Sequence, residues 1–202
     1  MKLNKQNWKE VSFEEVADHI ESTEKDEEIR KTLNYVAVEH LDTLDLRVKG
    51  KAKEEQPTFS RKFKKRQILF AKRNLYLRKV AIAPFDGLCS PHLWALETNG
   101  LLSNKLLAFI MQTNTFNEYV NSNAAGTMSK YLKWPALSQF KFKLPSDKDQ
   151  QVILDLLLTL EKQINITEDQ ENNLVATKRQ VLRNLFSNNK LGTFLDLSDF
   201  KS

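Results

Sequence analysis

The middle of the chain carries its hydrophobic residues in short runs of three to five, separated by polar residues. Runs of this length that are rich in branched and aromatic side chains are typical of β-strands. They predict strands over 68–70, 75–77 and 80–82, and a further strand over 88–96 that follows a turn at 84–87. We therefore expect β-hairpins to dominate this region.

Apolar residues at helical spacing predict short helices on both sides of the hairpins. Ser12 and Glu15 have the spacing of a capping box, which predicts a helix from about residue 12. A longer pattern predicts one helix over 103–120, and Pro135 predicts the first turn of another short helix. The segment 34–41 is rich in residues that favour strands and predicts one more strand.

The last part of the chain has a different pattern, a stripe of apolar residues spaced by alternating steps of four and three. Ser146 as a cap, with no proline after it, predicts one helix from Asp147 to about Phe186. At ~1.5 Å per residue this helix is roughly 60 Å long, so we expect it to project from the preceding domain and to pair with another chain. The apolar residues of the expected dimerisation seam are Ile153, Leu157, Leu160, Ile164, Leu174, Val181 and Leu185.

Together these patterns predict an α+β fold in three parts. Residues 1–145 form a globular domain of β-hairpins and short helices, residues 146–187 form the long coiled-coil helix, and residues 188–202 form a tail. A single cysteine excludes an internal disulfide, and no run approaches the ~18 apolar residues of a membrane span. We expect a cytoplasmic protein with no membrane segment.

The net charge of +5 is distributed unevenly along the chain. Residues 1–55 carry 10 basic and 14 acidic side chains, residues 56–145 carry 14 basic and 3 acidic ones, and residues 146–202 carry 7 basic and 9 acidic ones. Within 56–85 there are nine basic residues and no acidic one, interleaved with the predicted strands. Such a segment favours a polyanionic partner, and a folded basic surface favours nucleic acid over a membrane.

The sequence lacks the residues that an enzyme acting on nucleic acid needs. Its five scattered glycines form neither a phosphate-binding loop nor a dinucleotide-binding motif, and no base-methyltransferase motif is present. Cys89 and His92 have too few further soft ligands for a zinc site, and the nuclease-like tripeptide 199–201 lies in the tail. We therefore expect no catalytic residue, no metal and no cofactor in this chain.

Two motifs, one in the basic segment and one directly after it, carry a resemblance to a known family. The core Lys72-Arg73-Asn74-Leu75-Tyr76-Leu77-Arg78-Lys79 is followed by Phe85-Asp86-Gly87-Leu88-Cys89-Ser90, and both resemble stretches of the specificity (S) subunits of type I restriction-modification systems. Gly126-Thr127-Met128-Ser129 and Leu144-Pro145 followed by Gln150 support the resemblance, which covers nearly the whole chain.

The resemblance implies a target-recognition domain that reads one half of a split site in double-stranded DNA. It also implies that the helix pairs with its counterpart and docks methyltransferase (M) subunits, which hold S-adenosylmethionine, and it leaves open a restriction (R) subunit. The usual S subunit has two recognition domains and two helices, whereas this chain has one of each, so it is either a half-subunit that dimerises or a truncated half. The alternative is a general or regulatory nucleic-acid-binding coiled-coil protein without a methyltransferase partner.

We expect the DNA-binding surface on the basic segment. Because residues 72–79 also form the family-wide core, we expect them to bind phosphates or to support the fold rather than to read variable bases. The candidate residues are Arg61, Lys62, Lys64, Lys65, Lys72, Arg73, Arg78 and Lys79, with Asn74, Tyr76 and Lys130 as further candidates.

Overall fold

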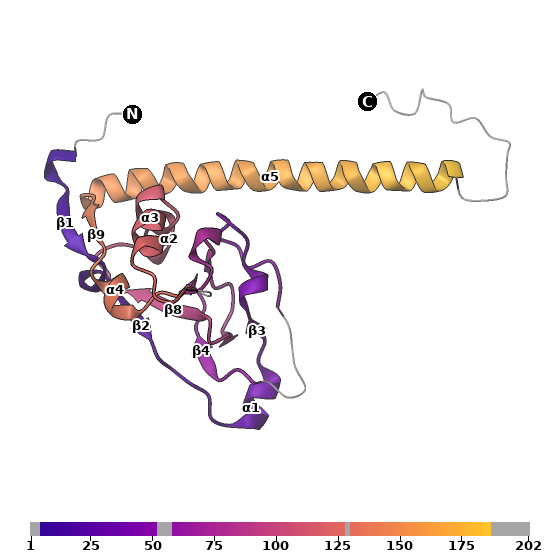
Figure 1. Cartoon of the computed structure of the whole chain (residues 1–202). Coiled ribbons are helices and arrows are strands. Elements are labelled where there is room, and N and C mark those ends of the chain that lie inside the picture. Colours follow the sequence, from indigo (N-terminus) through magenta and orange to yellow (C-terminus); the bar gives the residue numbers. More distant parts are fainter. Residues whose placement is uncertain (1–4, 52–57, 128–129, 187–202) are drawn as a thin grey trace. The chain divides into compact units, whose positions relative to one another are not determined.

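The computed structural model describes residues 5–51, 58–127 and 130–186 (Figure 1). The chain forms two compact units, one ending at Leu154 and one beginning at Asp155. The strands are β1 (Lys9–Ser12), β2 (Ala17–Ile20), β3 (Tyr35–Val36), β4 (Arg61–Phe63), β5 (Ile68–Ala71), β6 (Val80–Ile82), β7 (Gly87–Cys89), β8 (Leu93–Thr98) and β9 (Lys141–Leu144). The helices are α1 (Glu27–Thr32), α2 (Asn104–Met111), α3 (Asn114–Ser122), α4 (Trp134–Ser138) and α5 (Asp147–Phe186), and the single 3₁₀ turns are η1 (Lys5–Asn7), η2 (Phe13–Glu15), η3 (Val38–His40) and η4 (Leu75–Leu77).

A four-stranded antiparallel sheet with the strand order β2-β8-β5-β6 forms the centre of the first unit. Successive residues of a strand point to opposite faces, and both faces of β5 are buried. Ile68 and Phe70 pack into one hydrophobic core, and Leu69 and Ala71 pack into another. Since neither face meets water, the strand needs no polar alternation, which explains its unbroken apolar run in the sequence.

The first core lies between the central sheet and the helices α2, α3 and α4. Phe116 of α3 meets Phe70 and Phe140 edge-on at ring-centre distances of 5.8 and 5.1 Å, and Trp134 meets Trp94 edge-on at 6.0 Å. The second core lies between the other face and the sheet β3-β7-β4, in which β3 is parallel and β4 antiparallel to β7. The predicted α+β fold is confirmed.

The strand pair β1-β9 brings the two ends of the globular unit together, with Lys9 opposite Leu144. This places Trp8 beside the start of α5, where its Nε1 donates to Asp149 Oδ2 at 2.9 Å. Ser146 Oγ accepts from the Asp149 amide at 3.3 Å, so the predicted cap is confirmed. Ile153 packs against the first core, which explains why the first turns of α5 belong to the globular unit.

Two predictions for the N-terminal and middle parts are wrong. Glu15 does accept from the Ser12 amide at 2.6 Å, but the capped segment is the single turn η2, because the chain then continues as β2 and pairs with β8. The predicted strand over 75–77 is the turn η4, because the Leu77 and Arg78 amides donate to the Asn74 and Leu75 carbonyl oxygens at 2.9 and 3.0 Å. The residues at its two ends, Asn74 and Arg78, have positive φ angles of 52° and 47°.

The predicted single helix over 103–120 is also wrong, since α2 ends at Met111 and α3 begins at Asn114. Thr113 causes the break, because its Oγ1 accepts from the Phe116 amide at 3.3 Å and caps a new helix. The strand predicted over 34–41 is shorter in the structure, where only Tyr35–Val36 form β3 and the turn η3 follows. The helix α5 has the predicted bounds, and no described helix is long and apolar enough to cross a membrane.

Candidate nucleic-acid interface

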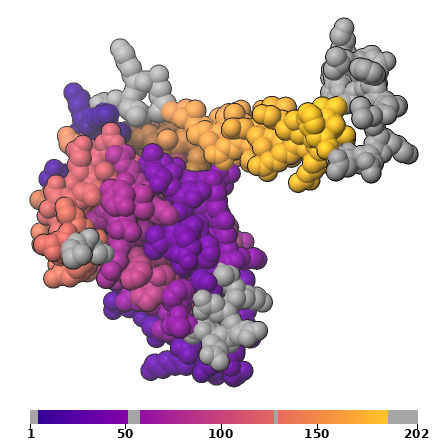
Figure 2. Space-filling model, turned by 45° about the vertical axis from the view of Figure 1, so that its right-hand side comes forward, coloured from indigo at the N-terminus to yellow at the C-terminus, as the bar shows by residue number. Residues whose placement is uncertain are grey.

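Three segments of the chain meet at the C-terminal end of β5, directly after Ala71. The Lys72 amide donates to the His92 carbonyl oxygen at 3.0 Å, and the Leu132 amide donates to the Lys72 carbonyl oxygen at 2.8 Å. Arg73 pairs with Tyr131 in an isolated antiparallel bridge. The segment after β5, the turn between β7 and β8 and the segment around Tyr131 therefore lie side by side. Figure 2 shows parts of the globular unit that are far apart in the sequence next to one another on its surface.

Cations gather where these segments meet. Arg61 lies in β4 opposite Cys89, and its charge acts on Lys72. The pKa of Lys72 is lowered first by partial burial and then by Arg61 and Arg73. Lys130 is exposed and directly precedes Tyr131. We define the basic face as Arg61, Lys72, Arg73, His92 and Lys130.

Aromatic rings support two of these cations. The Lys72 ammonium lies 5.4 Å from the centre of the Trp94 ring, and the Arg73 guanidinium lies 5.9 Å from the centre of the Tyr131 ring. Contacts between a cation and an aromatic ring restrict the long side chain and leave its charge directed outward. A ligand that meets these cations therefore loses less side-chain entropy than one that orders free lysines.

Two histidines lie in or beside the basic face and were not predicted as site residues. His19 lies between Trp94 and Trp134, at ring-centre distances of 5.2 and 5.7 Å, and its Nδ1 is 3.5 Å from Glu21 Oε1. Burial lowers the pKa of His19, and Glu21 only partly opposes this shift. Burial and the neighbouring cations likewise lower the pKa of His92. Both imidazoles are therefore mainly neutral at pH 7.

The turn η4 and the two residues after it continue from the basic face and include three more of the predicted residues. Arg78 Nη1 donates to Asn114 Oδ1 at 2.7 Å, which ties the turn to α3. Lys79 Nζ donates to the Val38 carbonyl oxygen at 3.0 Å, so this lysine supports the fold. Tyr76, at the top of the turn, is 68% exposed.

The structure places Lys62, Lys64 and Lys65 away from the basic face. The Lys62 ammonium lies 3.0 Å from Glu24 Oε2, and this hydrogen bond lowers the pKa of the Glu24 carboxyl. Lys64 and Lys65 lie in the turn before β5, at the opposite end of that strand, where the Lys65 amide donates to Asp86 Oδ1 at 2.6 Å.

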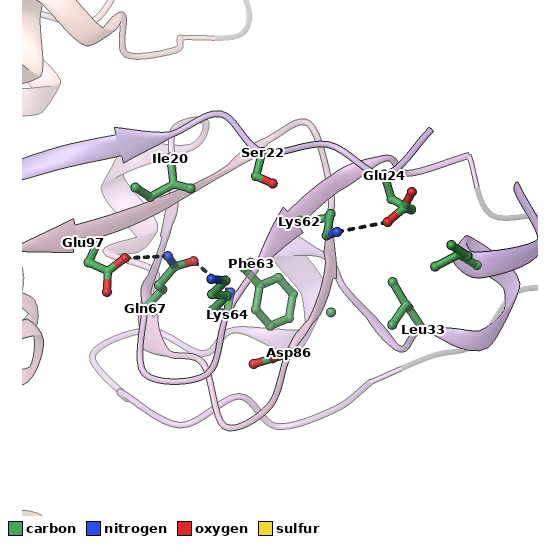
Figure 3. A pocket seen from close by; sticks show the side chains of 12 residues that line it. Ile20, Ser22, Glu24, Leu33, Lys62, Phe63, Lys64, Gln67, Asp86 and Glu97 are labelled. Atoms are coloured by element: carbon green, nitrogen blue, oxygen red, sulfur yellow. Dashed lines mark hydrogen bonds and ion pairs between the residues drawn. The ribbon is translucent and has the colours of Figure 1, made fainter. Parts of the chain in front are cut away.

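A cavity of about 550 Å³ opens at this opposite end of the sheet (Figure 3). Gln67 lies in its wall, with its Nε2 donating to Glu97 Oε2 at 2.8 Å and its Oε1 accepting from the Lys64 amide at 2.8 Å. Because carboxylates line the cavity together with the lysines, the local charge is mixed. The sequence run of cations is therefore divided between a basic end and a mixed end of the same sheet.

The described residues show no group of three side chains that could hold a metal ion. Cys89 is 1% exposed, and burial raises the pKa of its thiol to about 11, so it stays protonated. The tail 188–202, with its tripeptide 199–201, and Met128 and Ser129 of the motif around Gly126 lie outside the described residues.

The seam residues of α5 differ in exposure. Ile153 is half-buried against the globular core, while Leu160, Ile164, Leu174 and Leu185 are 51%, 57%, 71% and 55% exposed. Leu157 and Val181 are half-buried. From Leu160 onwards the helix thus presents apolar side chains that its own unit does not cover.

The fold is similar to that of solved type I specificity subunits. The HsdS subunit from Thermoanaerobacter tengcongensis matches with a TM-score of 0.66 and 17% identity over 98% of this chain and 53% of that chain. The S subunit from M. genitalium matches with a TM-score of 0.64 and 16% identity over 93% of this chain and 48% of that one. A chain from a study of the assembly of a type I R-M system matches with a TM-score of 0.69 and 15% identity, over 98% of this chain and 53% of that chain.

Comparison of the sequence identifies the family to which the chain belongs. The model of the type I restriction modification DNA specificity domain matches residues 5–176, and the chain therefore belongs to this family. It is 26% identical over 181 residues to the specificity subunit of the type I restriction enzyme EcoDI from Escherichia coli. That alignment covers 85% of this chain and 40% of the relative, so the chain spans about half the length of the proteins it matches or less. The resemblance inferred from the sequence motifs is confirmed.

Proposed function

We propose that this chain is the DNA-binding part of a type I restriction-modification complex and recognises one half of a bipartite site. The observation that carries the proposal is the basic face, where Arg61, Lys72, Arg73 and Lys130 come together from separate segments of a DNA specificity domain. Duplex DNA presents dense negative charge, and a cluster of oriented cations binds it through its phosphates. Neighbouring loops then supply contacts to the base edges.

In this proposal residues 1–145 are the recognition domain, residues 146–187 are the spacer and dimerisation helix, and residues 188–202 are the tail. The exposed apolar stripe from Leu160 to Leu185 supports pairing of α5 with the helix of a second copy. Two such half-subunits together have the length of the relatives. The pair then carries two recognition domains, as a bipartite site requires.

The chain itself has a binding role. The methyltransferase subunit that it recruits supplies adenine methylation with its own S-adenosylmethionine, and cleavage requires a restriction subunit. The family of the chain supports this division of labour. Incubation of the purified chain alone with S-adenosylmethionine or Mg²⁺ should give no product, and turnover there would contradict the proposal.

Selection from a random duplex library tests sequence recognition directly. The chain is mixed with the methyltransferase subunit encoded beside it, and bound duplexes are sequenced over several rounds. We expect one enriched motif, bound ~10³-fold or more tightly than random duplex. Equal binding to all sequences would instead identify a general nucleic-acid-binding protein.

Light scattering tests the pairing. We expect a mass near twice the 23.5 kDa of the chain, and uptake of the methyltransferase subunit by that dimer. A monomer that still takes up the methyltransferase would contradict the half-subunit proposal and would indicate that a different second half is required.

A further inference from the structure

The turn η4 exposes the side chain of Tyr76 to solvent. Leu75 is 3% exposed and anchors the turn, and the Leu77 and Arg78 amides donate to the Asn74 and Leu75 carbonyl oxygens at 2.9 and 3.0 Å. Asn74 and Arg78, which flank the turn, have left-handed backbone conformations. The hydrogen bond from Arg78 Nη1 to Asn114 Oδ1, at 2.7 Å, ties the turn to α3. The backbone that carries Tyr76 therefore has a defined position.

Tyr76 is more exposed than any other large hydrophobic side chain in the described part of the globular unit. It is 68% exposed, whereas Leu44, Leu101 and Ile29 follow at 51%, 50% and 45%. The left-handed conformation at a residue as large as Arg78 costs free energy, and such conformations persist where the surrounding structure or the function requires them. An aromatic ring exposed on a turn that two left-handed residues flank indicates a partner.

The charge around Tyr76 indicates which partner this is. The ring lies three residues after Arg73 and four after Lys72, within the 30-residue segment 56–85 that contains no acidic residue. A protein surface that buries an aromatic ring beside a basic segment without acidic residues would need acidic groups of its own, whereas DNA offers phosphates and flat apolar base and sugar surfaces a few ångströms apart.

We propose that the Tyr76 ring enters a groove of the bound duplex and packs on a sugar and base edge beside the phosphates that Lys72 and Arg73 hold. This inference rests on the proposed function and adds a non-ionic contact to it. The contact releases no counterion, so it contributes to affinity without contributing to the salt dependence. It is thus separable by experiment from the contacts of the basic face.

Tyr76→Ala and Tyr76→Phe test the inference in the full chain with its methyltransferase partner. Binding of the selected duplex is measured by fluorescence anisotropy at several salt concentrations. We expect Tyr76→Ala to weaken binding about tenfold at every salt concentration, with an unchanged slope of log affinity against log salt. Tyr76→Phe keeps the ring and should bind within about twofold of the unmodified chain.

Leu44→Ala is the matched control, since Leu44 is the next most exposed large hydrophobic residue in the described part of the globular unit, and it should leave DNA binding unchanged. Thermal unfolding of Tyr76→Ala should match that of the unmodified chain, because the ring is mainly outside the fold. Wild-type affinity in Tyr76→Ala would overturn the inference, and a loss of methyltransferase uptake with intact DNA binding would reassign Tyr76 to that partner. If the unmodified chain shows no preferred duplex, the proposed function fails instead.

Discussion

The division of the cations between two ends of one sheet gives a prediction with a built-in control. Lys72→Gln with Arg73→Gln removes two charges from the basic face, and Lys64→Gln with Lys65→Gln removes two from the opposite end. The net charge changes equally in both variants. Strand β5 separates the two pairs by at least about 13 Å at ~3.3 Å per residue, which exceeds the screening length of about 8 Å at physiological salt.

The magnitude follows from counterion release. Each phosphate contact adds about 0.9 to the slope of log affinity against log salt, so two lost contacts lower the slope by about 1.8. Between 50 and 200 mM salt one contact changes affinity about 3.5-fold and two change it about 12-fold. The ratio of the DNA affinity of the unmodified chain to that of the Lys72/Arg73 variant should therefore be about 12-fold smaller at 200 mM than at 50 mM salt.

Fluorescence anisotropy with a labelled duplex, titrated at four salt concentrations, measures both slopes. We expect the Lys64/Lys65 variant to keep the slope of the unmodified chain, because Lys64 and Lys65 lie at the mixed end, where Lys64 lines the cavity with Asp86 and Glu97. Glutamine preserves much of the packing of the Lys72 stem against Trp94, and near-wild-type thermal unfolding should verify this. Equal slopes for both variants would refute the placement of DNA on the basic face.

Three further outcomes are expected. The pKa of His92 is lowered in the free chain, and a nearby phosphate would raise it in the complex. Because the complex then binds more protons than the free chain, DNA affinity should increase as pH falls from 7.5 to 5.5. Anisotropy should show a weaker pH dependence of affinity in His92→Gln, and an identical profile would contradict this. Leu160→Asp with Leu174→Asp should reduce the light-scattering mass to that of a monomer while the globular unit stays folded by near-UV circular dichroism, and retained dimers would exclude the α5 stripe as the interface. Ser146→Ala removes the cap of α5 and should cost about 1 kcal/mol, seen as a melting temperature lower by about 2–4 °C, with unchanged melting as the contrary result.

The parts of the fold that local sequence determines could be predicted. Helix α5 begins at its Ser146 cap, and its apolar stripe runs from Ile153 to Leu185, about nine turns at 3.6 residues per turn, so its bounds were visible in the sequence. The capping box of Ser12 and Glu15 is equally local, but whether a helix continues after it depends on the pairing of β2 with β8, some eighty residues away. The break between α2 and α3 at Thr113 was within reach, because a threonine before a new apolar repeat is a cap signal.

The candidate site was only partly accessible to sequence reasoning. The run of cations was evident, but its division depends on where β5 begins and ends. The pairing of Lys62 with Glu24 joins residues 38 positions apart. His19 and Tyr131 carry no local signal at all, because only the register of β2 on β8 and the bridge to Arg73 bring them to the basic face.

The proposed half-subunit has a consequence for its target. A closed pair of identical chains is related by a twofold axis, so each copy presents the same basic face and the same Tyr76 in inverted orientation. The two half-sites must then be identical and inverted, whereas a chain with two different recognition domains can read two unrelated halves. In the proposed pair, helix α5 separates the two half-sites, and its 40 residues span about 60 Å at ~1.5 Å per residue. An enriched motif with two different halves would therefore mean that this chain pairs with a different partner rather than with itself.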